Sequence, residues 1–362
     1  MGNGLSEVSA RELLRLREFT QCITPATTGT VADTVRHLLA LQAQDFANAL
    51  WAVGLRTKGA TRSDVLAALE RGEVVRSLPM RGTLHFIAAE DLRWMLSLTS
   101  ARILQATRTR FASLGLDPET LARSATLARK ELAGGAVSRE EFMKLMSGNG
   151  ISTEGQRGYH LIFYLTQQSL VCWGPPSGTQ QALVLVDDWI PAQALSHRDI
   201  ALAQFALRYF GGHGPATERD FAWWTKLTLA DVRAAMAACG DALTPLTHRG
   251  TRYWIASTEL AAAAGGRLGA AVHSLPGFDE YLLGYQDRAI PLTPEHSQRV
   301  VPGNNGIFLP TITANGRIAG TWRRTPRSKT AAIEPEHFDA ATPAEHAGFT
   351  KAAQAYSRFS RG

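Results

Sequence analysis

The chain has 362 residues, 45% of them hydrophobic, which supplies enough apolar material for several buried cores and excludes an intrinsically disordered polypeptide. Lysine and arginine total 38 against 32 acidic residues, a charge of +6 that permits a nucleic-acid partner without requiring one. Three widely spaced cysteines argue against a disulfide framework and a structural zinc site. With no signal peptide and no run of about 18 apolar residues, we expect a cytoplasmic protein without a membrane span.

The first elements predicted from the sequence are two helices. Thr30 and Asp33 form a capping-box pattern ahead of a helix over residues 31–41. Asp45 is placed to cap a second helix over residues 46–55. The residues between the two helices therefore form a short junction.

Two neutral amides, Gln42 and Gln44, occupy this junction at positions i and i+2. On a helix such side chains point in different directions, whereas on an extended segment they lie on one side. A further helix over residues 61–72 and a strand pair over 73–87 follow. Helices followed by a small hairpin are the order of a winged helix.

The same order of elements recurs twice more along the chain. The second set is PETLARSATLARKEL, SREEFMKLM and GYHLIFYLTQQSL, followed by the strand pair VCWGPPSGTQQALVLV. The third set is SHRDIALAQFALRYF, ATERDFAWWTKL and LADVRAAMAAC, followed by the strand pair LTPLTHRGTRYWI. The sets resemble each other in the order of their elements and hardly at all in their residues.

We therefore predict a helix-rich α+β chain with three tandem winged-helix domains and a β-rich C-terminal module. The predicted domains are residues 1–115, 116–192, 193–258 and 259–362, with Gln42 and Gln44 in the first. In the last, Asn315-Gly316 between alternating residues predicts a tight hairpin, and EHAGFTKAAQAYSRF predicts a closing helix.

Basic residues are concentrated in the segment RIAGTWRRTPRSK, residues 317–329, which contains no acidic residue. Such a hairpin and its exit can follow a phosphate backbone, although a solvated basic surface has the same composition. The predicted DNA-binding residues are Arg317, Arg323, Arg324, Arg327 and Lys329.

Common catalytic motifs are missing from the sequence. It contains no G-x-S-x-G, H-E-x-x-H or P-loop pattern, and no dinucleotide-binding fingerprint in a βαβ context. We therefore expect neither a metal nor a cofactor. His85 lies on the same strand face as Thr83, either as a hydrogen-bonded structural residue or at the rim of a pocket. Asp279, Glu280 and Asp287 with Arg288 are interpreted as an ion-paired structural corner rather than an acid/base pair.

Five motifs in order resemble one family over essentially the whole chain. LLALQAQD, MRGTLHFI with AAEDLRW, GPATERDFAWW, PGFDEYLLGYQDR and GRIAGTWRR are similar to the AlkZ-like bacterial family of winged-helix DNA glycosylases. The resemblance implies three winged helices curved around a DNA channel. It also implies hydrolysis of the N-glycosidic bond of alkylated purines, chiefly N7-alkylguanine, including bulky or crosslinking adducts, with double-stranded DNA as the partner and a monomer as the functional unit.

The family's catalytic signature is a glutamine, an apolar residue, and then glutamine or aspartate. Gln42-Ala43-Gln44 matches the double-glutamine form, so the chain resembles the azinomycin-resistance branch more than the YcaQ-like branch. The resemblance thus implies Gln42 and Gln44 as the catalytic residues, whereas the pattern alone is that of two solvent-facing residues at a helix end. Asp45 is either the helix cap or an additional carboxylate near the water, and Arg81, Thr83 and His85 are further candidates for the pocket.

Two other functions fit parts of the sequence. Winged helices most often serve in transcriptional regulators, but the third-domain helix LADVRAAMAAC offers only Asp231 and Arg233 among small residues to read bases. A protein that sequesters a toxin in an aromatic pocket is the second alternative.

Overall fold

The computed structural model describes residues 6–177, 180–265, 271–325 and 332–362. The chain forms two compact units, one of residues 1–65 with 202–362 and one of residues 66–201. Among the described residues, no helix combines the length and the apolar character needed to cross a membrane.

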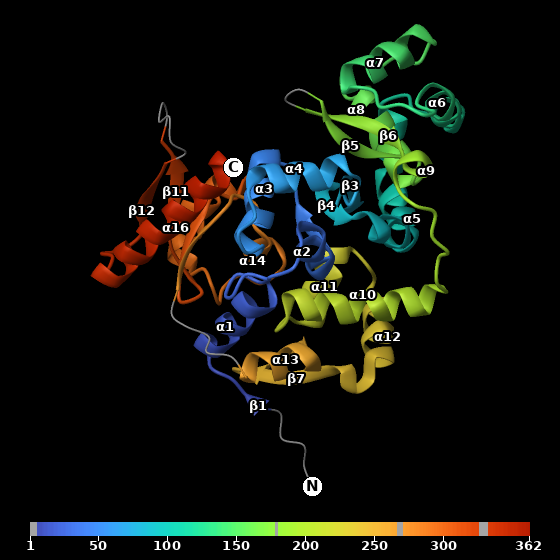
Figure 1. Ribbon diagram of the computed structural model, residues 1–362. Coiled ribbons are helices and arrows are strands. Elements are labelled where there is room, and N and C mark those ends of the chain that lie inside the picture. Colours follow the sequence, from blue (N-terminus) through green and yellow to red (C-terminus); the bar gives the residue numbers. More distant parts are fainter. Residues whose placement is uncertain (1–5, 178–179, 266–270, 326–331) are drawn as a thin grey trace. The chain divides into compact units, whose positions relative to one another are not determined.

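Three helices followed by an antiparallel hairpin occur three times in chain order (Figure 1). The first set is α2 (Val31–Leu38), α3 (Phe46–Arg56), α4 (Arg62–Glu70), β3 (Val74–Met80) and β4 (Thr83–Ala88). The second set is α6 (Pro118–Glu131), α7 (Arg139–Gly148), α8 (Arg157–Gln167), β5 (Val171–Ser177) and β6 (Gln180–Leu185). The third set is α10 (Arg198–His213), α11 (Glu218–Thr225), α12 (Leu229–Cys239), β7 (Leu243–His248) and β8 (Thr251–Ala256). This order confirms the predicted α+β class with repeated winged helices, whereas the four domain boundaries stay a prediction.

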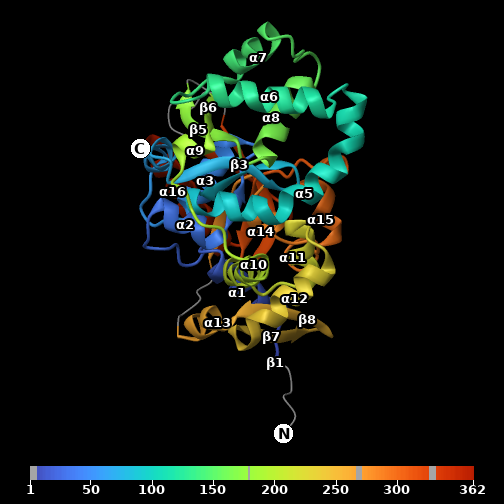
Figure 2. The same cartoon turned by 90° about the vertical axis from the view of Figure 1, so that its right-hand side faces the viewer.

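The N-terminal elements belong structurally with the third set. β1 (Ser6–Glu7) pairs in parallel with β7, and α1 (Ala10–Thr20) packs on α13 (Ser257–Ala264). Figure 2 shows α13 beside the β7–β8 hairpin. The apolar core here joins residues that are far apart in the sequence: Val8, Leu13, Leu16, Leu246, Tyr253, Ile255 and Ala263.

The C-terminal module is a four-stranded sheet covered by a long helix. Its strand order is β12-β11-β10-β9, with β9 (Val272–Leu275), β10 (Thr311–Ala314), β11 (Arg317–Arg324) and β12 (Ile333–His337). α16 (Pro343–Arg361) packs on β9, on β12 and on α3 (Figure 1), which confirms the predicted closing helix. The shorter elements are η1 (Gly240–Ala242), α14 (Glu280–Leu283), α15 (Pro294–Val300) and η2 (Pro302–Asn304).

The predicted Asn-Gly turn joins β10 to β11. Asn315 and Gly316 have φ values of 52° and 80°, the left-handed conformation that a two-residue hairpin turn requires. Arg249 and Gly250, with φ values of 49° and 74°, make the corresponding turn between β7 and β8.

One long helix was not predicted from the sequence. α5 (Ala89–Ser113) has 25 residues, and α9 (Val186–Trp189) is a short helix in the same unit. Most side chains of α5 after Ile103 are exposed, so the apolar stripe that reveals an amphipathic helix fades along its second half. The core of residues 66–201 packs around Phe142, Met146, Leu161 and Leu165.

Candidate active site

The segment between α2 and α3 carries the two glutamines. α2 ends at Leu38, three residues earlier than predicted, because Leu39 adopts a φ of 65° that a right-handed helix cannot accommodate. Ala40–Gln42 then form the short strand β2. The helix start was predicted correctly, since Thr30 and Asp33 form the capping box.

Buried and more exposed residues alternate along the glutamine segment. Leu41 and Ala43 are buried, at 1% and 0% exposure, whereas Gln42 is half-buried and Gln44 is exposed. This alternation is the period-two pattern of an extended segment. Gln42 ends β2 and Gln44 follows in a bend, so the two amides are the more exposed side chains of a short stretch in which Leu41 and Ala43 are buried.

Asp45 ends this segment as the N-cap of α3. Its backbone is extended, and its carboxylate accepts a hydrogen bond of 2.9 Å from the backbone N–H of Asn48. The predicted cap is therefore present, and the side chain is otherwise exposed to solvent.

A buried carboxylate lies behind the glutamine segment. The backbone N–H of Gln42 donates to Oε1 of Glu280 over 3.1 Å. Glu280 is 1% exposed and begins α14. The sequence pattern did not connect these two residues, which lie 238 positions apart. Its one hint was an Asp-Glu pair inside an apolar stretch, where carboxylates require specific partners.

The acidic corner predicted around residue 280 has its ion pair with an arginine from outside the predicted motif. Asp279 forms a two-pronged ion pair with Arg56 of α3, not with Arg288, whose Nε donates to the backbone oxygen of Leu282. Asp287 accepts the backbone N–H of Ala289. The corner is ion-paired as predicted, and the cation that pairs with Asp279 is Arg56 of a distant helix, which the pattern did not indicate.

The remaining predicted pocket residues belong to the other compact unit. Arg81 donates to Nε2 of His85 over 2.9 Å, and the His85 Nδ1–H donates to the backbone oxygen of Thr83 over 2.7 Å. Because an arginine only donates, these contacts fix the protonated nitrogen of His85 as Nδ1. His85 is 0% exposed, so the structure places it as a hydrogen-bonded interior residue, and a role for the three residues at a pocket stays a prediction.

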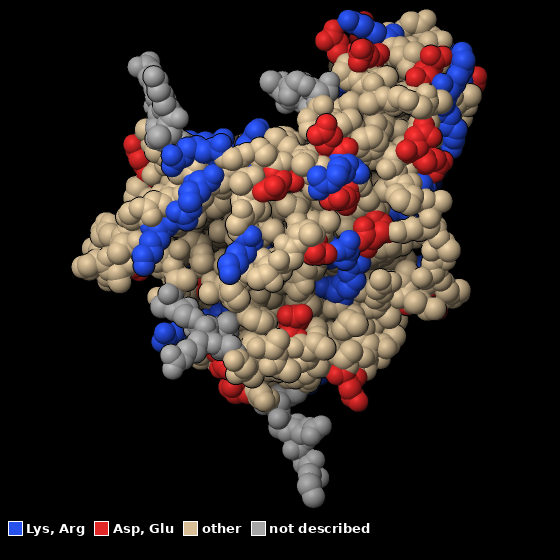
Figure 3. Space-filling view, viewed as in Figure 1, with Lys and Arg blue, Asp and Glu red and all other residues tan. Residues whose placement is uncertain are grey.

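The predicted DNA-binding arginines lie on β11. Arg317, Arg323 and Arg324 are exposed, while Arg327 and Lys329 lie outside the described residues. Arg323 lies 3.4 Å from Glu334 at the surface, and the Arg324 guanidinium lies 5.8 Å from the ring of Tyr356. Figure 3 shows basic side chains gathered over α16 and the adjoining sheet.

Trp322, between these arginines, is an anchor rather than a surface residue. It is 3% exposed, and its Nε1–H donates to the backbone oxygen of Leu275 over 2.7 Å. In β11 the aromatic ring of Trp322 is therefore buried, whereas the two arginines that follow it at the end of the strand are both exposed.

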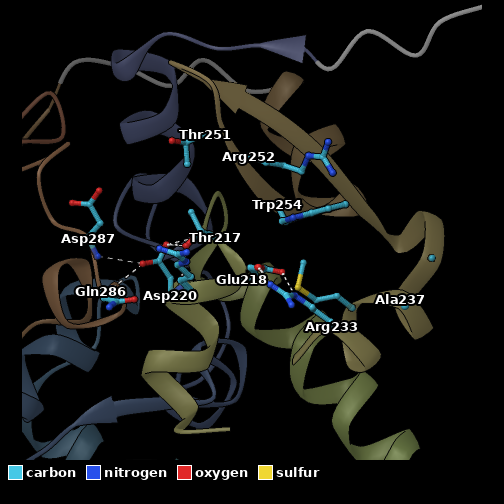
Figure 4. A pocket seen from close by; sticks show the side chains of 13 residues that line it. Thr217, Glu218, Asp220, Arg233, Ala237, Thr251, Arg252, Trp254, Gln286 and Asp287 are labelled. Atoms are coloured by element: carbon cyan, nitrogen blue, oxygen red, sulfur yellow. Dashed lines mark hydrogen bonds and ion pairs between the residues drawn. The ribbon is translucent and has the colours of Figure 1, made fainter. Parts of the chain in front are cut away.

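A large open cavity, which Gln42 and Gln44 do not line, lies beside α11, α12 and β8 (Figure 4). Its volume is about 1090 Å³, and Arg233, Glu218, Trp254 and Gln286 are among its lining residues. Arg233 of α12 donates to both carboxylate oxygens of Glu218 over 2.8 and 3.1 Å. Thr228 caps α12, and its hydroxyl donates to the Asp231 carboxylate, so the two polar side chains of α12 that could read bases both have partners within the protein.

The comparisons with known proteins agree on one family. The family model described as "DNA glycosylase AlkZ-like" matches residues 35–359. An interstrand DNA cross-link repair glycosylase of Streptomyces sahachiroi is 25% identical over 329 residues, which cover 87% of this chain and 88% of that protein. The solved structure of the Streptomyces sahachiroi DNA glycosylase AlkZ superimposes with a TM-score of 0.81 at 24% identity, covering 98% of this chain and 97% of that one. The chain belongs to the AlkZ-like family of DNA glycosylases, enzymes that hydrolyse N-glycosyl bonds.

Proposed function

We propose that this glycosylase excises alkylated purines from double-stranded DNA, chiefly N7-alkylguanine, with Gln42 and Gln44 holding the attacking water. The observation that supports the proposal is the alternation of burial at the end of β2, where Gln42 and Gln44 are more exposed than Leu41 and Ala43. Two side chains with carbonyl oxygens on the same side can accept both hydrogens of one water.

Neutral amides suit this reaction chemically. Alkylation at N7 gives guanine a formal positive charge, which makes the base a good leaving group, and its departure develops positive charge on the sugar. The reaction then needs an oriented water and favourable dipoles more than a strong base. An undamaged guanine leaves poorly and is not released by such a site, which gives the enzyme its selectivity for damage.

Bulky adducts, including crosslinked bases, are part of the proposed substrate class. The relative from Streptomyces sahachiroi is named for interstrand cross-link repair. Gln44 is exposed rather than enclosed. A site that is open to solvent can accept a base that carries a large substituent, and this favours self-resistance to a DNA-alkylating natural product as the biological setting.

The arginines of β11 are proposed to bind the phosphate backbone. Arg317, Arg323 and Arg324 are exposed on one strand in the same compact unit as Gln42 and Gln44. Basic side chains that replace counterions along DNA give an affinity that falls steeply with salt. The engaged state of Arg233 and Asp231 on α12 speaks against a regulator that reads a DNA sequence with that helix.

The test is an excision assay. Duplex DNA with N7-methylguanine or a bulky N7-guanine adduct is incubated with the protein, and abasic sites are cleaved with alkali. We expect strand breaks at the adduct with the wild-type chain and none with Gln42→Ala/Gln44→Ala, whose affinity for DNA stays close to that of the wild type. Full activity of the double variant would refute the assignment of the site, and no cleavage across an adduct panel would refute the substrate class.

A further inference from the structure

We propose that Glu280 is a positioning residue for Gln42, an inference that rests on the proposed function of the glutamine segment. The Glu280 carboxylate is 1% exposed and contacts the glutamine segment through the backbone N–H of Gln42, at 3.1 Å. It therefore acts on the peptide group that carries the amide side chain and not on the reacting atoms.

The second carboxylate oxygen of Glu280 contacts residues of two helices, α10 and α11. Oε2 of Glu280 accepts the Trp224 Nε1–H over 2.9 Å and lies 3.4 Å from Nε2 of His213. Trp224 belongs to α11, and His213 ends α10. One side chain thus joins the glutamine segment to two helices of the third winged helix.

The partners of Glu280 are themselves held in place. The His213 ring stacks on the Tyr209 ring, with centres 4.8 Å apart and an angle of 9° between the planes. The Tyr285 hydroxyl donates to the backbone oxygen of His213 over 2.7 Å. A Cβ added to Gly284 would lie 2.7 Å from Cδ2 of the histidine, so the ring is enclosed from that side as well. Burial lowers the pKa of His213, which keeps the ring neutral at neutral pH.

The glutamine segment needs such an anchor because it is short and irregular. It starts at Leu39 with a φ of 65°, and β2 has three residues. The direction of the Gln42 side chain follows from the orientation of its own N, Cα and C atoms. Without the bond to Glu280, the peptide group can rotate, and the amide then moves relative to the water it holds. A misplacement of about 1 Å at a reacting centre costs on the order of 100-fold in rate.

Asp220 provides a matched comparison. It is also a buried carboxylate, 1% exposed, and it lies on α11 like Trp224. Its oxygens accept the backbone N–H groups of Thr217 and Gln286, each over 2.8 Å. Asp220→Asn and Glu280→Gln thus replace one oxygen of an equally buried carboxylate by an amide nitrogen that faces a donor.

The experiment measures single-turnover excision of N7-methylguanine from duplex DNA, with the Kd for undamaged duplex measured in parallel on the full chain. We expect Glu280→Gln to slow excision about 100-fold at an unchanged Kd, whereas Asp220→Asn stays within about threefold of the wild type. In Glu280→Gln the new amide nitrogen faces a donor in either orientation, the Gln42 backbone N–H or the Trp224 Nε1–H, so the contact with Gln42 is lost or disturbed. Glu280→Gln/Trp224→Phe removes that conflict and is expected to recover part of the lost rate.

The results distinguish the positioning role of Glu280 from the proposed function of Gln42 and Gln44. A Glu280→Gln variant within about threefold of the wild-type rate overturns the positioning role. So does a double variant slower than Glu280→Gln, or an equal loss in Asp220→Asn, because each would indicate general damage to the fold. Excision that survives Gln42→Ala/Gln44→Ala would instead remove the proposed function of the glutamines.

Discussion

Arg56 and Asp279 form a two-pronged ion pair in the interior, with N–O distances of 2.7 and 2.8 Å and side-chain exposures of 0% and 3%. Arg56 lies at the end of α3, and Asp279 caps α14, which begins with Glu280. The pair therefore connects α3, which follows the glutamine segment, with α14, whose Glu280 accepts the backbone N–H of Gln42. Because it is buried, the loss of either partner leaves a charge without compensation.

Asp279→Ala is expected to lower the free energy of unfolding by about 3–5 kcal/mol, because it leaves the buried Arg56 guanidinium without a counterion. Denaturant unfolding followed by tryptophan fluorescence measures the change. Arg233→Ala, which breaks an exposed ion pair with Glu218 in the same unit, is the control and should change stability far less, because solvent screens the pair. Equal losses in the two variants would contradict the role given to the buried pair.

Glu18 makes stability depend on pH. Burial raises the pKa of this carboxyl from its ordinary 4.5 to about 7. Between these two values the unfolded chain loses the proton before the folded chain does, so the stabilisation present below pH 4.5 fades as the pH rises through 7. Glu18→Gln cannot lose a proton and should be more stable than the wild type at about pH 8, with a smaller difference at about pH 4.5. Glu12→Gln, at an exposed position of the same helix, controls for the loss of one carboxylate from α1.

Gly316 is required by both conformation and packing. Its φ is 80°, and an added Cβ would lie 2.6 Å from the Cβ of Leu14. At Gly250, φ is 74° and the space around it is open. Gly250→Ala should therefore cost about 1 kcal/mol of stability for the backbone alone, and Gly316→Ala about 1–3 kcal/mol more. Thermal unfolding of the two variants measures these losses. Similar losses of stability would show that Leu14 moves aside without cost to accommodate the added Cβ.

Two variants of Asp45 distinguish a role as helix cap from a role as catalytic carboxylate. Asp45→Ala loses the bond to Asn48 and should cost about 1 kcal/mol of stability. Asp45→Ser keeps a side-chain acceptor without a charge, so we expect it to retain both stability and excision. If the carboxylate activates the water, Asp45→Ser would instead be stable and slow, which single-turnover excision would reveal.

The arginines of β11 should determine the salt dependence of DNA binding. Arg323→Ala/Arg324→Ala is expected to weaken binding to all duplex sequences and to reduce the slope of log K against log salt by about 0.9 for each phosphate that is no longer neutralised. Fluorescence anisotropy over a salt series measures that slope. Arg233→Ala removes a basic residue from α12, where Glu218 holds it, and an equal effect per residue would mean that net charge alone governs affinity.

Much of the local structure was predictable because its signals are short-range. The capping box at Thr30, the cap at Asp45 and the Asn315-Gly316 turn each involve residues at most three positions apart. Their chemistry decides the backbone almost regardless of the rest of the chain. The order of helices and hairpins, and with it the winged-helix character, follows from the same kind of local information.

By itself, the sequence determined the element order, the family resemblance and the position of Gln42 and Gln44 at a junction between helices. Only the tertiary structure decided that α2 stops at Leu38 and that Glu280, 238 residues away, holds the backbone of Gln42. It also decided that Arg56, and not Arg288, neutralises Asp279. The physical reason is that a buried carboxylate needs partners, and which donors reach it depends on how distant helices pack, a property that no local pattern contains.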